Sequence, residues 1–184
     1  MRELSLHILD ALENSVEAGA TRIELLIEED LQNDILRITI KDNGRGMSED
    51  MVKKVLDPFF TTRTTRHVGL GLPLFAAAAQ QCNGALYIQS QPGIGTTVEV
   101  TFQHSHIDRA PLGDMTATLL AVLMSERPVD IYYKHVIDKR TFEFDTAEIR
   151  QELGDVPLSH PMIRGWLETT LREGLATLQS SETK

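Results

Sequence analysis

Residues 57–74, with the sequence DPFFTTRTTRHVGLGLPL, place a pair of glycines at the entry to an apolar helical segment. Gly69 and Gly71 are separated by Leu70 and follow a loop rich in threonine and arginine. Backbone N–H groups at the start of a helix are free to bind anions, and the helix dipole favours negative charge there. Glycine pairs also occur in ordinary turns. The segment is therefore typical of a phosphate-binding loop, provided that neighbouring motifs agree.

Two polar side chains lie one helical turn apart in a predicted helix over residues 3–18. Asn14 offers an amide oxygen, which can bind Mg2+ without adding negative charge beside phosphates. Asp10 lies on the same face, where a carboxylate can act as a general base on water or on a substrate hydroxyl. The alternative is that both are plain polar residues on an exposed helix face. His7 falls on this face too, and we expect it to border the site rather than to accept a phosphoryl group.

The motif DNGRGM, residues 42–47, follows a predicted strand. A carboxylate at Asp42 can accept a hydrogen bond from the amino group of adenine and reject guanine, which presents a carbonyl instead. Gly44 and Gly46 let the backbone pass close to a flat base, on which Met47 is expected to pack. Asp-Asn-Gly is also a common turn sequence. Its place between the other motifs favours adenine recognition.

Taken in order, the segment around Asn14, DNGRGM, GLGLPL and the GIGTT motif of residues 93–97 resemble the N, G1, G2 and G3 boxes of the histidine-kinase-like ATPase superfamily. That superfamily includes histidine kinases, anti-sigma kinases, type II topoisomerases and mismatch-repair ATPases. The resemblance covers residues 1–104. It implies that ATP and Mg2+ bind here, with Asn14 as the metal ligand, Asp42 on adenine and Thr96 adding a polar contact beneath the base.

The resemblance also implies a lid over ATP formed by residues 59–68, with Gly69 and Gly71 as phosphate contacts and hinges. The ATPases and serine kinases of the superfamily usually carry glutamate where this chain has Asp10. The shorter aspartate moves the carboxylate by more than ~1 Å, which is enough to matter for a positioned base. Whether Asp10 is catalytic therefore stays open at this stage.

The fold that the resemblance implies is an α/β two-layer sandwich, the Bergerat ATP-binding fold, with a mixed, mostly antiparallel sheet under helices. Periodicity alone predicts an α/β two-layer arrangement. The predicted strands and helices of this range are strands 22–29, 35–41, 85–90 and 96–103 and helices 50–56 and 70–81.

Residues 109–184 are predicted to form a small α+β unit beside an ATP-binding domain of residues 1–108. Their pattern predicts a helix over 115–124, a hairpin near 130–144 and a final helix beginning at Pro161. Apolar residues line one side of this last helix, namely Ile163, Trp166, Leu167, Leu171, Leu175 and Leu178. The helix either docks on the core or provides a surface for a second copy or a protein partner.

The composition narrows the class of protein. A net charge of −9 over 184 residues argues against a nucleic-acid surface, which is basic. A single cysteine, Cys82, excludes an intramolecular disulfide framework, and no apolar run is long enough for a bilayer. The N-terminal segment does not read as a signal peptide. We therefore expect a cytoplasmic protein that contacts neither nucleic acid nor membrane.

Three functions follow from this pattern. The first is an ATPase or nucleotide-dependent switch. The second is a protein kinase that phosphorylates a partner in trans, and the third is a nucleotide sensor in which Asp10 is not a working base. The expected partners are ATP and a protein partner or substrate, and a homodimer is possible. The alternating His104-Ser105-His106-Ile107-Asp108 segment does not favour a metal site, because it lacks a second ligand cluster.

Overall fold

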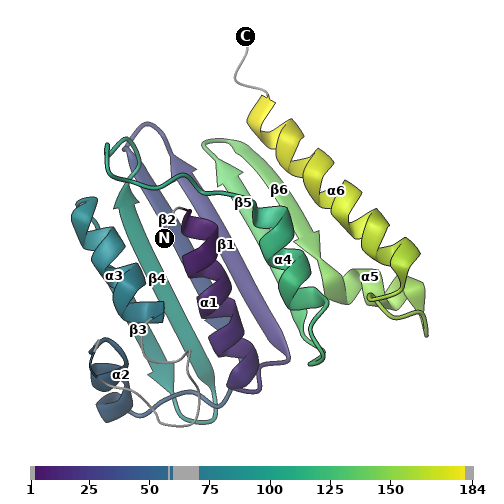
Figure 1. Ribbon diagram of the computed structural model, residues 1–184, viewed down its shortest axis with the longest axis horizontal. Coiled ribbons are helices and arrows are strands. Elements are labelled where there is room, and N and C mark those ends of the chain that lie inside the picture. Colours follow the sequence, from purple (N-terminus) through teal and green to yellow (C-terminus); the bar gives the residue numbers. More distant parts are fainter. Residues whose placement is uncertain (1–2, 58, 60–70, 181–184) are drawn as a thin grey trace.

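The computed structural model describes residues 3–57, 59 and 71–180. In this part of the chain the elements follow in the order α1 (Leu4–Glu17), β1 (Arg22–Asp30), β2 (Ile35–Asp42), α2 (Glu49–Val55), α3 (Gly71–Gln81), β3 (Leu86–Gln91), β4 (Gly95–Gln103), α4 (Met115–Leu123), β5 (Asp130–Ile137), β6 (Arg140–Asp145), α5 (Thr146–Leu153) and α6 (Pro161–Ser180). Figure 1 shows α3, α1 and α4 side by side across one face of a single sheet.

The sheet has six strands in the order β3-β4-β2-β1-β5-β6. Four of the neighbouring pairs are antiparallel, and only the β1–β5 pair is parallel. A parallel pair needs a crossover connection, and the chain between β4 and β5 supplies one through α4. The expected α/β fold with a mixed, mostly antiparallel sheet under helices is confirmed.

The alternation of side chains explains why one face of the sheet is covered. In β1, Ile23, Leu25 and Ile27 are fully buried, while the residues between them are only partly buried. Successive side chains of a strand point to opposite faces, so these three lie under the helices. Burial of one such aliphatic side chain contributes about 1.5–3 kcal/mol. From α1, Ile8 and Leu12 fill the same core.

The C-terminal range continues this sheet. Strand β5 pairs with β1 along eight residues, from Arg22 opposite Asp130 to Glu29 opposite Ile137. Buried residues of α4, β5 and α6 belong to one hydrophobic cluster with those of α1 and β2. Both predicted ranges, 1–108 and 109–184, thus contribute to one sheet and one core. Their division into two units stays a prediction.

Two features of the C-terminal range differ from the expectations. Helix α5 was not predicted, although its Ile149 and Leu153 lie four residues apart and pack against the core. In α6, Leu167, Leu171 and Leu178 are buried, but Trp166 is 51% exposed. The expectation that Trp166 shares the docked side was wrong, since it neighbours Leu167 in sequence and lies about 100° around the helix from it.

Candidate nucleotide-binding site

A cavity of about 140 Å3 lies between α1 and the sheet, where β2 ends and β4 begins. Five of the residues singled out from the sequence line it: Asn14, Asp42, Gly46, Met47 and Thr96. Its apolar wall includes Ile40, Leu72 and Val98. An apolar pocket with a few convergent polar groups is the usual composition of a small-molecule site.

The carboxylate of Asp42 is oriented by three donors. Ser15 Oγ donates to Asp42 Oδ2 at 2.6 Å, and the N–H groups of Gly44 and Thr96 donate to Oδ1 at 2.9 and 3.3 Å. Because an ionised carboxylate has about four acceptor positions, capacity remains for a further donor. Ser15 belongs to α1, so the helix and the sheet jointly hold Asp42 in one orientation.

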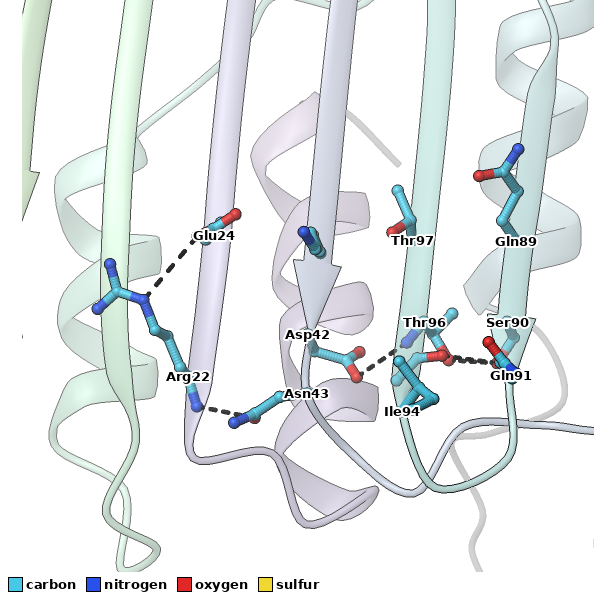
Figure 2. Close-up of a pocket in the computed structure, with 12 residues that line it drawn as sticks. Arg22, Glu24, Asp42, Asn43, Gln89, Ser90, Gln91, Ile94, Thr96 and Thr97 are labelled. Carbon is cyan, nitrogen blue, oxygen red and sulfur yellow. Dashed lines mark hydrogen bonds and ion pairs between the residues drawn. The ribbon is translucent and has the colours of Figure 1, made fainter.

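A polar row crosses three strands at this end of the sheet. Asp42 of β2 and Ser90 of β3 are both register partners of Thr96 in β4. All three lie on the helix-covered face, since they alternate in step with the buried residues Ile40 and Val98. Figure 2 shows the row from the opposite face of the sheet, with dashed lines from Thr96 to Asp42 and to Ser90.

Sequence reasoning missed Ser15 and Ser90. Ser90 Oγ accepts the N–H of Met47 at 2.7 Å and so ties the DNGRGM segment to β3. Ser15 directly follows Asn14, but its role depends on the packing of α1 over β2. The sequence offered one signal for Ser90: it shares a face of β3 with the apolar residues Leu86 and Ile88.

The glycines of DNGRGM permit close contacts within the chain itself. A Cβ atom at Gly44 would lie 2.9 Å from the carbonyl oxygen of Ala18. Gly46 has φ +69°, and its Cβ would lie 2.0 Å from the carbonyl oxygen of Gln91. Side chains at either position would push the segment away from α1 and from the β3–β4 turn. The glycines therefore set the width of the cavity.

Asp10 and Gly71 lie beside the cavity. A Cβ atom at Gly71, the first residue of α3, would lie 3.3 Å from Asp10 Cβ and 3.9 Å from Asn14 Nδ2. The N-terminus of α3 therefore faces the pair Asp10 and Asn14 on α1. Gly69 and, apart from Phe59, the predicted lid of residues 59–68 lie outside the described residues.

The expectation for His7 was wrong. Its side chain is 5% exposed and its ring stacks on Phe75 of α3, with ring centroids 5.0 Å apart. Burial lowers the pKa of His7 below its usual value. A helical wheel groups His7 with Asp10, but it does not show that α3 covers this part of α1. His7 is a packing contact between two helices.

A larger hollow of about 420 Å3 lies on the open face of the sheet (Figure 2). It is lined by polar side chains such as Lys41, Gln89 and Thr97 and shares Asp42 and Thr96 with the smaller cavity. One of the two cations that line it, Arg22, pairs with Asp145 at 3.2 Å. Of these two, the smaller cavity lies between a helix and the sheet and joins apolar walls to Asp42.

The other polar cluster of the helix-covered face is built around Glu29. Glu29 Oε1 bonds His104 Nε2 at 3.0 Å, and Oε2 bonds His135 Nε2 at 2.7 Å. The other ring nitrogen of His135 bonds the hydroxyl of Tyr133 at 2.9 Å. Burial raises the pKa of Glu29, but the hydrogen bonds from the two histidines outweigh it, so the pKa lies below its usual value. Within the described ranges, no group of three or more His, Cys, Asp and Glu side chains is arranged to hold a metal ion.

Fold and site together define an ATP-binding protein of the histidine-kinase-like class. Residues 2–106 match the family described as histidine kinase-, DNA gyrase B-, and HSP90-like ATPase. The match covers more than half of the chain, and the chain belongs to this family. The resemblance that the four motifs indicated is thereby confirmed, and the match supports ATP binding.

Curated relatives include sporulation kinase E of Bacillus subtilis, 37% identical over 71 residues, and the signal transduction histidine-protein kinase AtoS of Escherichia coli, 36% identical over 91 residues. These matches cover 39% and 49% of this chain. The chain spans only 10% and 15% of the two kinases. Across the relatives compared, the matched part of this chain spans 10% to 29% of the relative's own length.

The crystal structure of the N-terminal domain of a DNA repair protein has a similar fold, with a TM-score of 0.53 and 15% sequence identity. The similarity covers 78% of this chain and 52% of that one. This is a larger share than residues 2–106, so the likeness in fold extends into the C-terminal range. None of the helices in the described part of the chain has the length and hydropathy needed to cross a bilayer.

Proposed function

We propose that the chain binds Mg-ATP with adenine at Asp42, and that it hydrolyses ATP or uses it as a nucleotide-dependent switch. The observation that carries the proposal is the orientation of Asp42 at the cavity by three donors, with acceptor capacity left for the adenine amino group. Ile40, Val98 and Met47 supply apolar surface for the faces of the base. A base with a carbonyl in place of the amino group would meet only an acceptor at Asp42.

The phosphates are proposed to extend from this cavity toward Asn14 and the N-terminus of α3. The free N–H groups of a helix N-terminus favour an anion, and Gly71 brings that N-terminus against α1 without a side chain between them. The amide oxygen of Asn14 is a hard neutral donor that fits Mg2+, and it lines the cavity. When bound, Mg2+ would neutralise phosphate charge.

Asp10 is the proposed general base. It lies one turn before Asn14 and beside Gly71, so its carboxylate is on the side of α1 where the phosphates would end. In hydrolysis, Asp10 would accept a proton as the oxygen of water bonds to the γ-phosphorus and the bond to ADP breaks. The same carboxylate can accept the proton of a hydroxyl group on a protein substrate.

Turnover of γ-labelled ATP with Mg2+ tests this function. We expect wild type to release labelled phosphate, and Asp10→Asn to lose roughly 100-fold or more of that rate while binding ATP as well as wild type. Asp155→Asn, at an exposed position after α5 and away from the cavity, is the matched control and should keep full activity. Equal turnover in Asp10→Asn and wild type would contradict a catalytic role for Asp10. Absence of ATP binding in wild type would contradict the whole proposal.

The alternative function is a protein kinase that acts in trans, and the similarity to histidine kinases favours it. The exposed side chains of Met162 and Trp166, one turn apart on α6, are the proposed contact surface for a protein partner or a second copy. The same labelled ATP distinguishes this function, because label would then reach an added protein instead of appearing as free phosphate. If ATP binds but label moves in neither assay, the chain is a nucleotide sensor.

A further inference from the structure

Ser90 makes three hydrogen-bond contacts through one oxygen atom. Its Oγ lies 2.7 Å from the backbone nitrogen of Met47, 3.1 Å from the carbonyl oxygen of Gly95 and 2.8 Å from Thr96 Oγ1. The side chain is partly buried on the helix-covered face, at the outer end of the polar row. Ser90 itself is not among the residues that line the nucleotide cavity, whereas Thr96 is. Any effect of Ser90 on a ligand must therefore pass through its neighbours.

The chemistry of these groups limits the direction of each bond. The N–H of Met47 can only donate, and the carbonyl of Gly95 can only accept. Ser90 has one hydroxyl hydrogen, and the bond to Gly95 uses it. Either hydroxyl can donate in the contact between Ser90 and Thr96. Donation by Thr96 is the arrangement in which all three contacts of Ser90 are hydrogen bonds. Thr96 Oγ1 then has its own hydrogen engaged, and only lone pairs are left for the cavity.

We infer that Ser90 is a positioning residue that sets base specificity, because it holds the hydroxyl of Thr96 as an acceptor toward the nucleotide cavity. This inference rests on the proposed adenine site at Asp42. Asp42 and Thr96 are register partners on one face, so the polar end of the cavity presents acceptors from two adjacent strands. That pattern suits the exocyclic amino group of adenine, which carries two donor hydrogens. A base with a carbonyl at that position finds no donor from either side chain.

The test compares ATP with inosine triphosphate, which has a carbonyl in place of the adenine amino group. The ratio of their dissociation constants is measured by isothermal titration calorimetry for wild type and for Ser90→Ala. In Ser90→Ala the hydroxyl of Thr96 is free to turn and donate into the cavity. We expect the preference for ATP to fall by about threefold to tenfold, the range of one neutral hydrogen bond.

Three further variants keep the test decisive. Ser90→Thr retains the hydroxyl and should retain the wild-type ratio. Thr97→Val changes the adjacent residue on the open face of β4 and should also retain it. Thr96→Val removes the group through which Ser90 acts, so adding Ser90→Ala to Thr96→Val should not change the ratio further.

A purely structural role for Ser90 predicts a different result. If Ser90 acted only through its bond to Met47, Ser90→Ala would weaken the binding of ATP and of inosine triphosphate equally. An unchanged ratio of the two dissociation constants would therefore overturn the inference. The inference would also be overturned if Ser90→Ala changed the ratio of dissociation constants in the Thr96→Val background as much as it does in wild type. If wild type binds neither nucleotide, the proposed ATP site itself fails, which is a separate outcome.

Discussion

The polar clusters around Asp42 and Glu29 lie at opposite ends of the helix-covered face of the sheet and differ in whether the carboxylate opens onto a cavity. Asp42 stands at the end of β2 beside a cavity, and its acceptors exceed the donors around it. Glu29 stands at the end of β1, and each of its oxygens meets a histidine. Within the described residues, the first cluster has acceptor capacity that opens onto the cavity. The second joins elements of the chain to one another.

The second cluster links distant parts of the sequence. His104 follows β4, and His135 belongs to β5, so Glu29 connects the C-terminal strands to the ATP-binding domain. His135 is buried, and its two ring nitrogens bond the hydroxyl of Tyr133 and the carboxylate of Glu29. Asp42 lines the cavity and Glu29 does not, so the hydrogen bonds of Glu29 hold elements of the chain together, whereas the spare acceptor capacity of Asp42 opens onto a pocket. Four predictions test this contrast.

The largest effect is expected at the cavity. Asp42→Asn keeps an oxygen for the N–H groups of Gly44 and Thr96 but places an NH2 group where the second carboxylate oxygen was. We expect ATP affinity to fall by about 100-fold or more, because a charged acceptor is replaced by a donor that opposes the adenine amino group. Calorimetric titration measures the ATP affinity, and the exposed Asp155→Asn serves as the control that should not change it. ATP binding within threefold of wild type would show that Asp42 does not read the base.

At the other cluster, Glu29→Gln should reduce stability and leave ATP affinity unchanged. The Gln amide group would face the N–H of a histidine, which leaves a partly buried donor without an acceptor. We expect a loss of about 2 kcal/mol, or a decrease in Tm of about 4–8 °C for a domain of this size. Thermal unfolding measures it.

The control for this prediction is the neighbouring residue on the open face. Glu28 makes only an exposed ion pair with Arg37 at 3.7 Å, so Glu28→Gln should cost less than about 1 kcal/mol. Equal decreases in Tm for the two variants would show that the histidine network contributes no more than a surface ion pair.

A smaller effect on binding is expected from Ser15→Ala. The substitution removes one of the three donors that orient Asp42 and should lower ATP affinity by about fivefold to tenfold. Ser5→Ala changes another buried serine of α1, at the end away from the cavity, and should leave affinity unchanged. An affinity of Ser15→Ala equal to that of the control would show that Asp42 is held without the helix.

The smallest effect concerns pH. The pKa of Glu29 in the folded protein lies below its ordinary value of 4.5, so its contribution to stability is present above about pH 4.5 and is lost as the pH falls through the lower, folded value. Between about pH 5 and pH 4, the stability difference between wild type and Glu29→Gln should therefore shrink, by less than about 1 kcal/mol. Urea unfolding at several pH values measures it. A difference that grows on acidification would contradict the assigned sign.

Much of the site could be predicted from the sequence because its chemistry is local. Asn14, Asp42 and Thr96 were identified from residue type and from the order of the motifs, and the structure brings them to one cavity. The same local signals predicted helix α1 and the β1–β2 pair. By contrast, Ser15 and Ser90 matter only through the partners that packing and strand register give them. No local pattern contains that information.

The burial of His7 and the exposure of Trp166 show the same limit. A helical wheel predicts which residues share a face, but the neighbouring element decides whether that face is covered. α3 covers His7, and α6 docks through leucines that leave Trp166 outside. Both outcomes depend on contacts between segments far apart in the chain.

The amino-acid sequence by itself determined the family, the alternation that buries one face of the sheet, and the residues that we propose for adenine, phosphate and Mg2+. These follow from residue type and from spacing over a few positions. The tertiary structure decided that β5 pairs with β1, that Glu29 meets two histidines, and that Asp42, Thr96 and Ser90 form one row. Strand pairing and register depend on the sum of many side-chain contacts across the core, and no short segment of the chain contains that sum.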